Sequence, residues 1–188
     1  MDDESLTPIH GSAKARGEGE TIAETRRLVL RPFDDSDAAF IVALLNDPAF
    51  LQYIGDRQVR SLADASDYIA RGPQAMYAAH GFGLYLVTVR ATGEKAGMCG
   101  ILKRDALEDP DVGFAFLPAF RGHGYAREAL DAVLSLAIDV HGLTRLAAIV
   151  DPANARSVGL LERAGFRTER RITMPDETTE LLLMGMDL

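Results

Sequence analysis

The clearest periodic pattern in the chain is an apolar stripe that begins after Ala126 and ends before Gly142. Its members recur at intervals of three and four residues, which is the spacing of one face of an α-helix. They are Leu130, Val133, Leu134, Ala137, Ile138 and His141. Since glycine commonly ends a helix, we predict a long amphipathic helix between these two positions.

Shorter apolar runs, bounded by turn residues, predict strands before and after this helix. These strands are expected at 28–30, 82–90, 96–102, 112–117 and 146–150, with a final pair from Phe166 to 186. Two further helices are expected early in the chain, one after Asp34–Ser36 and one after Ser61 through Met76. The first of these is expected to stop at Asn46–Pro48.

A short helix over 158–164, ended by Gly165, completes the predicted order β-α-α-β-β-β-α-β-α-β-β. One strand–helix–strand unit flanked by hairpins implies a mixed sheet covered by helices, an α/β fold of the mixed α+β type. Residues 1–22 are polar and lack an apolar period, so we predict a flexible tail before a single domain over 23–188.

Charge and composition narrow the possible partners. The chain carries 20 Lys and Arg against 28 Asp and Glu, a formal net charge of −8, which argues against nucleic acid and anionic membranes. Its start lacks a signal-peptide core, and no apolar run approaches the roughly 20 residues that span a bilayer. With a single cysteine and no metal-ligand spacing among the histidines, we expect a reduced, cytoplasmic protein without a metal.

The candidate chemistry begins at the loop between the strand at 112–117 and the long helix. Gly122 and Gly124 allow close approach to the backbone and unusual dihedral angles, and Arg121 adds positive charge. The first turn of a helix has unpaired N–H groups and a partial positive charge, so this loop is a candidate pyrophosphate site. The plainer alternative is that the glycines only shape a tight strand-to-helix turn.

Two common phosphate motifs do not fit this loop. Gly122-x-Gly124-x-x-Arg127 has no third glycine, and the acidic residue expected about 20 positions later, Asp139, lies inside the helix. There is no GxxxxGK[ST] sequence either. A nucleotide-binding oxidoreductase is therefore a weaker hypothesis.

Arg121-x-x-Gly124-x-Ala126 resembles the acyl-coenzyme A signature of the GNAT superfamily of N-acetyltransferases. Three other segments are similar in order and spacing to its RimJ/RimL-like branch, and together the resemblance covers about 24–188. They are Thr25–Pro32 as the first strand, Gly97–Gly100 as the central hairpin, and Asn154–Phe166 as the closing helix and strand.

The resemblance implies a mostly antiparallel sheet, with helices on both faces, that is split by a V-shaped cofactor cleft. The pyrophosphate of acetyl-CoA would lie on the turn, and its pantetheine arm would pair with the edge of the strand as a pseudo-strand. Asn154 would hydrogen-bond the arm from the other side. The implied cofactor residues are Phe116, Leu117, Arg121, Gly122, His123, Gly124, Tyr125, Ala126, Arg127 and Asn154.

Acetyl transfer to an amine needs a base for the ammonium and a proton donor for the leaving thiolate. Asp111 lies where this branch often has Glu, so it is the candidate base, acting directly or through water; alternatively it caps or flanks a strand, or attracts a cationic substrate. Ser157 is the candidate acid, unless its hydroxyl caps backbone N–H groups instead. Tyr125 is a less favoured donor, and Glu128 is explained by its place in the first helical turn. Cys99 is expected to fill the core rather than form an acetyl-enzyme.

The resemblance implies transfer of acetyl from acetyl-CoA to a primary amine, in a small molecule or at a protein or peptide N-terminus, by direct attack in a ternary complex. A non-catalytic acyl-CoA-binding module is the alternative. A homodimer is possible, and the sequence does not choose the acceptor. The first two helices and the hairpin should line the acceptor pocket. Arg57 and Arg60 could meet an anionic acceptor group there, or they could simply belong to a solvated loop. The aromatic candidates are Phe50, Tyr53, Tyr68, Phe82 and Tyr85, each of which could equally be core.

Overall fold

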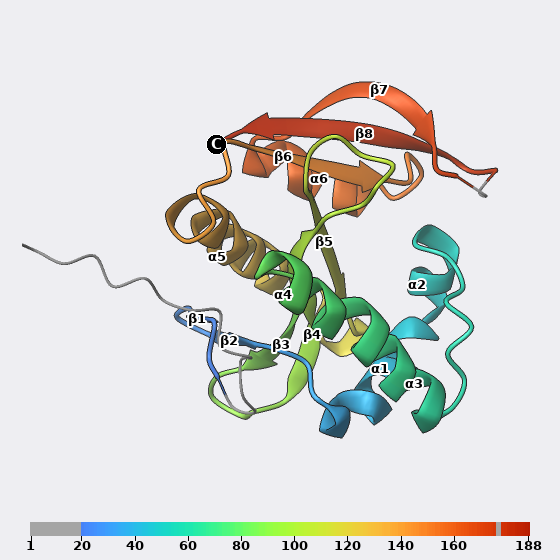
Figure 1. Cartoon of the computed structure of the whole chain (residues 1–188), viewed down its shortest axis with the longest axis vertical. Helices are drawn as coiled ribbons and strands as arrows, with labels where there is room; N and C mark the ends of the chain where they lie inside the picture. Colours follow the sequence, from blue (N-terminus) through green and yellow to red (C-terminus); the bar gives the residue numbers. More distant parts are fainter. Residues whose placement is uncertain (1–19, 176–177) are drawn as a thin grey trace, which may run out of the picture.

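In the computed structural model, which describes residues 20–175 and 178–188, the strands pair into an eight-stranded sheet (Figure 1). Its order is β1-β2-β3-β4-β5-β6-β8-β7, and neighbours are antiparallel except for β5 and β6. The strands are β1 (Ala23–Glu24), β2 (Leu28–Arg31), β3 (Leu84–Val89), β4 (Lys95–Leu102), β5 (Asp111–Phe116), β6 (Arg145–Val150), β7 (Arg167–Thr173) and β8 (Glu180–Asp187). The predicted mixed, mostly antiparallel sheet is confirmed.

Helices cover both faces because alternate residues of β3 point into two different apolar clusters. Tyr85 and Val87 pack with residues of α5, whereas Leu84 and Leu86 pack with residues of α1 and α3. The helical segments are η1 (Asp35–Asp37), α1 (Ala38–Leu45), α2 (Pro48–Tyr53), α3 (Leu62–Ile69), η2 (Ala70–Gln74), α4 (Ala75–His80), η3 (Pro118–Phe120), α5 (Tyr125–Asp139) and α6 (Ala155–Ala164). Within the described residues, no helix is long and apolar enough to cross a membrane.

The predicted stop at Asn46–Pro48 is also the start of a helix that the pattern did not indicate. Asp47 accepts hydrogen bonds from the N–H groups of Ala49 and Phe50, and Pro48 occupies the first helical position of α2. Proline suits that position because its missing N–H has no helical partner there. An Asp-Pro pair can therefore end one helix and begin the next.

The second predicted helix begins as expected, with a capping box formed by Ser61 and Asp64. It continues past Met76 to His80, as α3, the π-helical η2 and α4 in succession. Pro73 lies within η2, and its missing N–H explains why the regular α-helical bonding is interrupted there. The predicted tail falls almost entirely on residues 1–19, outside the described residues.

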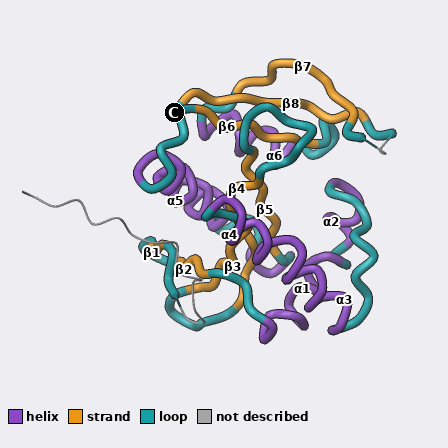
Figure 2. Tube along the Cα trace, viewed as in Figure 1, coloured by secondary structure: helices purple, strands orange, loops and turns teal. Residues whose placement is uncertain are grey.

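The sheet is split between β5 and β6. These parallel strands pair at one position, Asp111 with Ala147, whereas β4 and β5 pair along the whole length of β5. Figure 2 shows β6, β7 and β8 diverging from β1–β4, with β5 between the two halves. The split opens toward Phe116 and Val150, where the turn before α5 and the start of α6 follow.

Candidate active site

The turn before α5 presents a series of open backbone amides. Gly122 and Gly124 both adopt φ of +79°, a left-handed conformation that favours glycine. The first hydrogen bond of α5 runs from Glu128 N to Gly124 O, at 3.1 Å. Among the described residues, none accepts a hydrogen bond from the six N–H groups of residues 122–127. Such a concave set of donors at a helix N-terminus is suited to phosphate oxygens.

Two arginines predicted in this turn have their side chains committed elsewhere. Arg121 donates from Nε to the Phe116 carbonyl at 2.8 Å and forms an ion pair with the buried carboxylate of Asp47. Arg127 pairs with Asp131 at 2.8 Å and donates to the Arg163 carbonyl. Their side chains therefore tie the turn to α2 and α6, while the backbone N–H of Arg127 stays open toward the turn.

The cation that does lie against the turn is Arg27, which the sequence did not single out. Its Nη1 donates to the His123 carbonyl at 3.0 Å, and its guanidinium lies 4.7 Å from the centre of the Tyr125 ring. A Cβ on Gly124 would lie 3.4 Å from Arg27 Nη2. The His123 ring also stacks against Tyr125, with the ring centres 5.8 Å apart.

Glu128 holds Arg27 in this position. It accepts from Arg27 Nε at 2.7 Å, from the Arg27 backbone at 2.8 Å and from Thr25 Oγ1 at 2.6 Å. Burial alone would raise the pKa of Glu128, but these hydrogen bonds hold it below its ordinary value. Arg27 and Glu128 are 101 residues apart in sequence. The sequence shows Glu128 in the first turn of the helix, but it does not show that Arg27 is its partner.

The edge of β5 that faces the split is formed by Phe114 and Phe116. Peptide groups of alternate residues in an antiparallel strand point to opposite edges. Leu117 N donates to the Ala96 carbonyl of the β4 side at 2.9 Å, so Phe114 and Phe116 direct their peptide groups away from β4. Of the two predicted edge residues, Phe116 therefore faces the split and Leu117 does not. Phe114 was not predicted.

Across the split, Asn154 and Ser157 lie at the start of α6. Asn154 Oδ1 caps the helix by accepting from Ser157 N at 3.2 Å. The cap is thus made by Asn154 rather than by the Ser157 hydroxyl. Within residues 20–175 and 178–188, neither the Asn154 amide nitrogen nor the half-buried Ser157 hydroxyl has a hydrogen-bond partner.

Asp111 lies at the closed end of the split, where β5 meets β6. Its side chain is 1% exposed, and Arg104 Nε donates to both carboxylate oxygens, at 3.0 and 3.1 Å. Burial raises the pKa of Asp111 to about 6, and Arg104 offsets part of that rise. The group is therefore ionised at neutral pH yet more basic than a surface carboxylate. Arg104 has no motif of its own, so only the fold reveals it.

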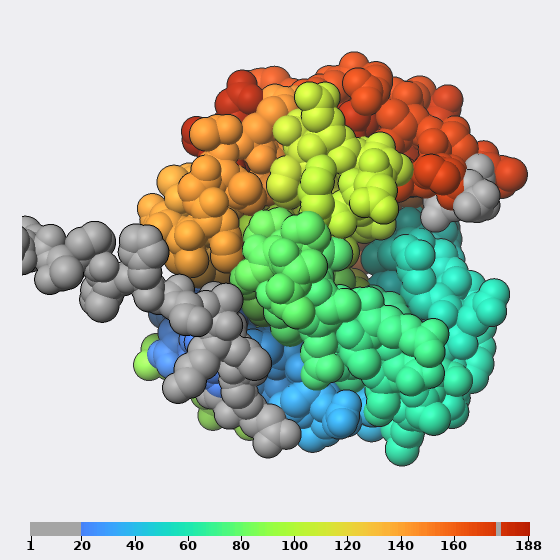
Figure 3. Space-filling view, in the orientation of Figure 1, coloured from blue at the N-terminus to red at the C-terminus, as the bar shows by residue number. Residues whose placement is uncertain are grey.

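On the acceptor side, three of the five aromatic candidates lie in the core, which was the stated alternative for each. Phe50, Phe82 and Tyr85 are buried core residues, at 3%, 7% and 1% exposure. Tyr68, by contrast, is half-buried at the edge of the cluster that contains Leu84 and Met98. Figure 3 shows the surface hollowed where the yellow-green β4–β5 loop, the turquoise α2–α3 segment and the red-orange C-terminal strands face one another.

Cys99 is buried in β4, and burial raises the pKa of its thiol to about 12. A thiol with that pKa is almost entirely protonated at neutral pH, so it is a poor nucleophile. This agrees with the expectation that it fills the core. Among the described residues, no three metal-ligating side chains lie together.

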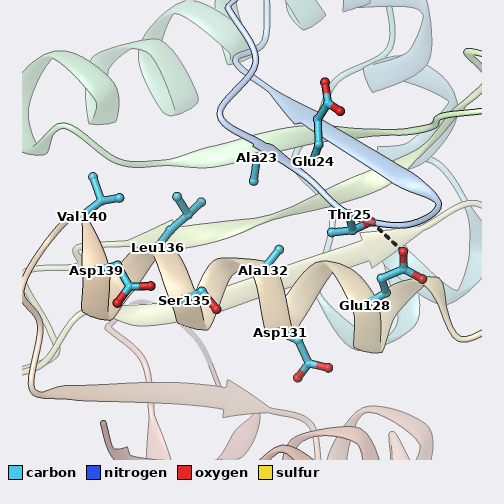
Figure 4. Close-up of a pocket in the computed structure, with 10 residues that line it drawn as sticks. All are labelled: Ala23, Glu24, Thr25, Glu128, Asp131, Ala132, Ser135, Leu136, Asp139 and Val140. Atoms are coloured by element: carbon cyan, nitrogen blue, oxygen red, sulfur yellow. Dashed lines mark hydrogen bonds between the residues drawn. The ribbon is translucent and has the colours of Figure 1, made fainter.

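A separate groove of about 430 Å³ lies between β1 and α5 (Figure 4). The hydrogen bond between Thr25 and Glu128 crosses one end of it. Its acidic lining, with Glu24, Asp131 and Asp139, repels phosphate, so it does not suit the pyrophosphate that the turn would hold.

Comparison with known proteins gives one consistent result. A family model described as the acetyltransferase (GNAT) domain matches residues 27–167. YkkB and the uncharacterized N-acetyltransferase YoaA, both from Bacillus subtilis, are each 29% identical over 79% of this chain, and 86% and 84% of those proteins is covered. RimL, a ribosomal L7/L12 alpha-N-protein acetyltransferase in complex with coenzyme A, superposes with a TM-score of 0.76. The two are 18% identical over 90% of this chain and 98% of that one, a likeness of fold.

Proposed function

Since a family model matches 27–167, the chain belongs to the GNAT acetyltransferases, and we propose that it acetylates a primary amine by direct attack within a ternary complex. It is an acetyl-CoA-dependent N-acetyltransferase. The observation that supports the proposal best is the row of six open amides over 122–127, beside a sheet that is split next to it.

In this proposal the turn binds the pyrophosphate through backbone N–H groups, while Arg27 adds positive charge beside Gly124. The peptide groups of Phe114 and the N–H of Phe116 bind the pantetheine arm, as a neighbouring strand would, while the Phe116 carbonyl already accepts from Arg121. The Asn154 amide faces that arm from the start of α6. Acetyl-CoA supplies the thioester, and the chain orients it toward the closed end of the split.

Asp111 acts as the base for the acceptor ammonium. A lysine-like amine has a pKa of about 10.4, so presenting its neutral form at pH 7 costs roughly 4.6 kcal/mol. A carboxylate with a pKa of about 6 is a stronger base than an exposed carboxylate. Asp111 is such a group, at the start of β5 and the closed end of the split. The proton passes directly or through one water.

Ser157 is the proposed donor to the leaving thiolate. Its hydroxyl is not needed for capping, because Asn154 performs that role. The thiol has a pKa near 8.5, so the leaving group needs only modest help. Ser157 would donate directly or orient a water that does.

The experiment measures binding and turnover separately. Calorimetry and thermal shift with acetyl-CoA are expected to show association and stabilisation, and NADH is expected to show neither. Thiol release is then followed with a panel of free amines and N-terminal peptides. Acetyl-CoA binding without acetylation of any amine would leave an acyl-CoA-binding module and would refute the proposed reaction.

A further inference from the structure

Arg104 uses one edge of its guanidinium and leaves the other open. Nε binds both oxygens of Asp111, whereas Nη1 and Nη2 have no hydrogen-bond partner among the described residues. The loop that carries Arg104 is fixed, because Leu107 N donates to the Arg104 carbonyl and Lys103 Nζ donates to the carbonyls of Leu107 and Glu108. A held guanidinium with open terminal nitrogens is a carboxylate-binding group.

Tyr68 and Arg57 complete the same corner from the α3 side. The Tyr68 hydroxyl has no hydrogen-bond partner among the residues described. Burial raises the pKa of Tyr68, while Arg57 and Arg104 both lie near enough to oppose that rise. Tyr68 packs on the cluster that includes Leu102, two residues before Arg104. Tyr68 therefore lies near both arginines, of which Arg57 comes from the segment between α2 and α3 and Arg104 from the loop between β4 and β5.

Arg57 differs from its neighbour Arg60 in how firmly it is bound. Arg60 pairs with Asp56 at 2.6 Å and with Asn46 Oδ1 at 2.8 Å. Arg57 makes one long and exposed hydrogen bond, from Nη2 to the Ile54 carbonyl at 3.4 Å. Arg60 therefore has a structural role, whereas the Arg57 guanidinium is largely unengaged and could bind a ligand.

Charge at this corner is opposite to that of the protein as a whole. Asp111 balances one of the two guanidinium groups, which leaves Arg57 in excess in a chain of net charge −8. An excess cation beside an open hydroxyl favours an anionic group and disfavours a second ammonium. The corner borders the hollow seen in Figure 3 between the β4–β5 loop and the α2–α3 segment.

We propose that the acceptor is a primary amine that also carries a carboxylate, bound by the terminal nitrogens of Arg104 together with Arg57 and the Tyr68 hydroxyl. The amine then points toward Asp111, which shares Arg104 with that carboxylate. This specificity rests on the proposed function, since it concerns the acceptor of the same acetyl transfer. A free amino acid and a peptide N-terminus followed by an acidic side chain share this chemistry.

The test compares matched amines that differ only in the carboxylate. Alanine is compared with alaninamide, and Ala-Glu-Ala amide with Ala-Gln-Ala amide. The pair that shows the preference identifies the source of the carboxylate. In the wild-type protein we expect kcat/KM to be roughly 10- to 100-fold higher for the carboxylate member, because a charge-assisted hydrogen bond is lost in the other.

Arg57→Gln should bring that ratio close to one through KM, with kcat and acetyl-CoA affinity unchanged, and Arg57→Lys should restore part of it. Arg60→Gln is the matched control and should keep the wild-type ratio. Equal kcat/KM within both pairs, or equal effects of the Arg57 and Arg60 changes, overturns the assignment while leaving acetyl transfer intact. If acetyl-CoA binds and no amine is acetylated, the proposed function fails and this inference fails with it.

Discussion

The turn before α5 and the corner around Asp111 lie at opposite ends of the same strand, β5, and bind in different ways. At the turn, backbone amides are open while the side chains of Arg121 and Arg127 are committed to other elements. At the corner, the backbone of β5 is paired on both sides, and the open groups belong to the side chains of Arg104 and Tyr68. The turn is suited to the pyrophosphate, which every CoA thioester carries, and the corner is suited to an acceptor that differs between enzymes.

This difference has a physical basis. Backbone donors are fixed by helix geometry and cannot be altered by most substitutions, so they suit an invariant ligand. Side-chain donors change with a single residue, so they suit a site where specificity varies. Variants at the two ends should therefore separate cofactor affinity from acceptor chemistry, and the following predictions test that separation.

The largest effect is expected for Asp111→Asn. Loss of the base should lower kcat/KM for the amine by about 1000-fold, within the range typical of general base catalysis. Because the wild-type pKa is about 6, activity should fall as the pH drops through 6, and the variant should lack that limb. The pH–rate profile is the measurement, with Asp105→Asn, at an exposed position in the loop before β5, as the control.

Asp111→Asn should also change how the stability of the protein depends on pH. The pKa of Asp111 is higher in the folded protein than its ordinary value near 4, so the wild-type protein loses stability as pH rises from about 4 to 6. Asp111→Asn removes the buried charge, and its melting temperature should exceed that of the wild type at pH 7.5 but not at pH 4. An unchanged pH–rate profile in this stable variant would exclude Asp111 as the base.

Gly124→Val should weaken acetyl-CoA binding by about 100-fold, because the strain of a β-branched residue at φ of +79° and the displaced amides act together. Calorimetry gives the affinity. Gly142→Val is the matched control, since Gly142 also has a positive φ, +60°, but lies beyond the other end of α5. If both variants bind acetyl-CoA as the wild type does, the turn is not the pyrophosphate site.

Ser157→Ala should reduce kcat by about tenfold and leave acetyl-CoA affinity unchanged, because a thiol leaving group needs little protonation in the transition state. Steady-state kinetics with saturating acetyl-CoA measures this, and Ser135→Ala on the exposed face of α5 serves as the control. A wild-type kcat in Ser157→Ala would remove the proposed donor.

Arg27→Gln is expected to have the smallest effect, about a threefold loss of acetyl-CoA affinity that shrinks further at high salt, since the Arg27 side chain is 35% exposed. Arg90→Gln removes the same charge from the residue whose backbone N–H donates to the Arg27 carbonyl, and it should have no effect. A change in amine KM in Arg27→Gln would contradict the separation between the two ends of β5.

The sequence predicted the backbone features well and the side-chain contacts poorly. The order of elements along the chain, the long helix and the glycine turn could be predicted, because each depends on local periodicity or on two neighbouring glycines. Arg27 and Arg104 could not, since their roles come from contacts with Glu128 and Asp111 that the fold creates. Helix α2 was missed because an Asp-Pro pair is typical both of the end of one helix and of the start of the next.

The single pair of residues that joins β5 to β6 has a consequence for the stability of the protein. Two half-sheets that pair at Asp111 and Ala147 leave a seam, which acetyl-CoA would fill in the binding mode proposed above. A ligand that binds the folded chain and not the unfolded one stabilises it in proportion to the logarithm of its concentration. We therefore expect the resistance of the purified protein to proteolysis to rise with the concentration of acetyl-CoA.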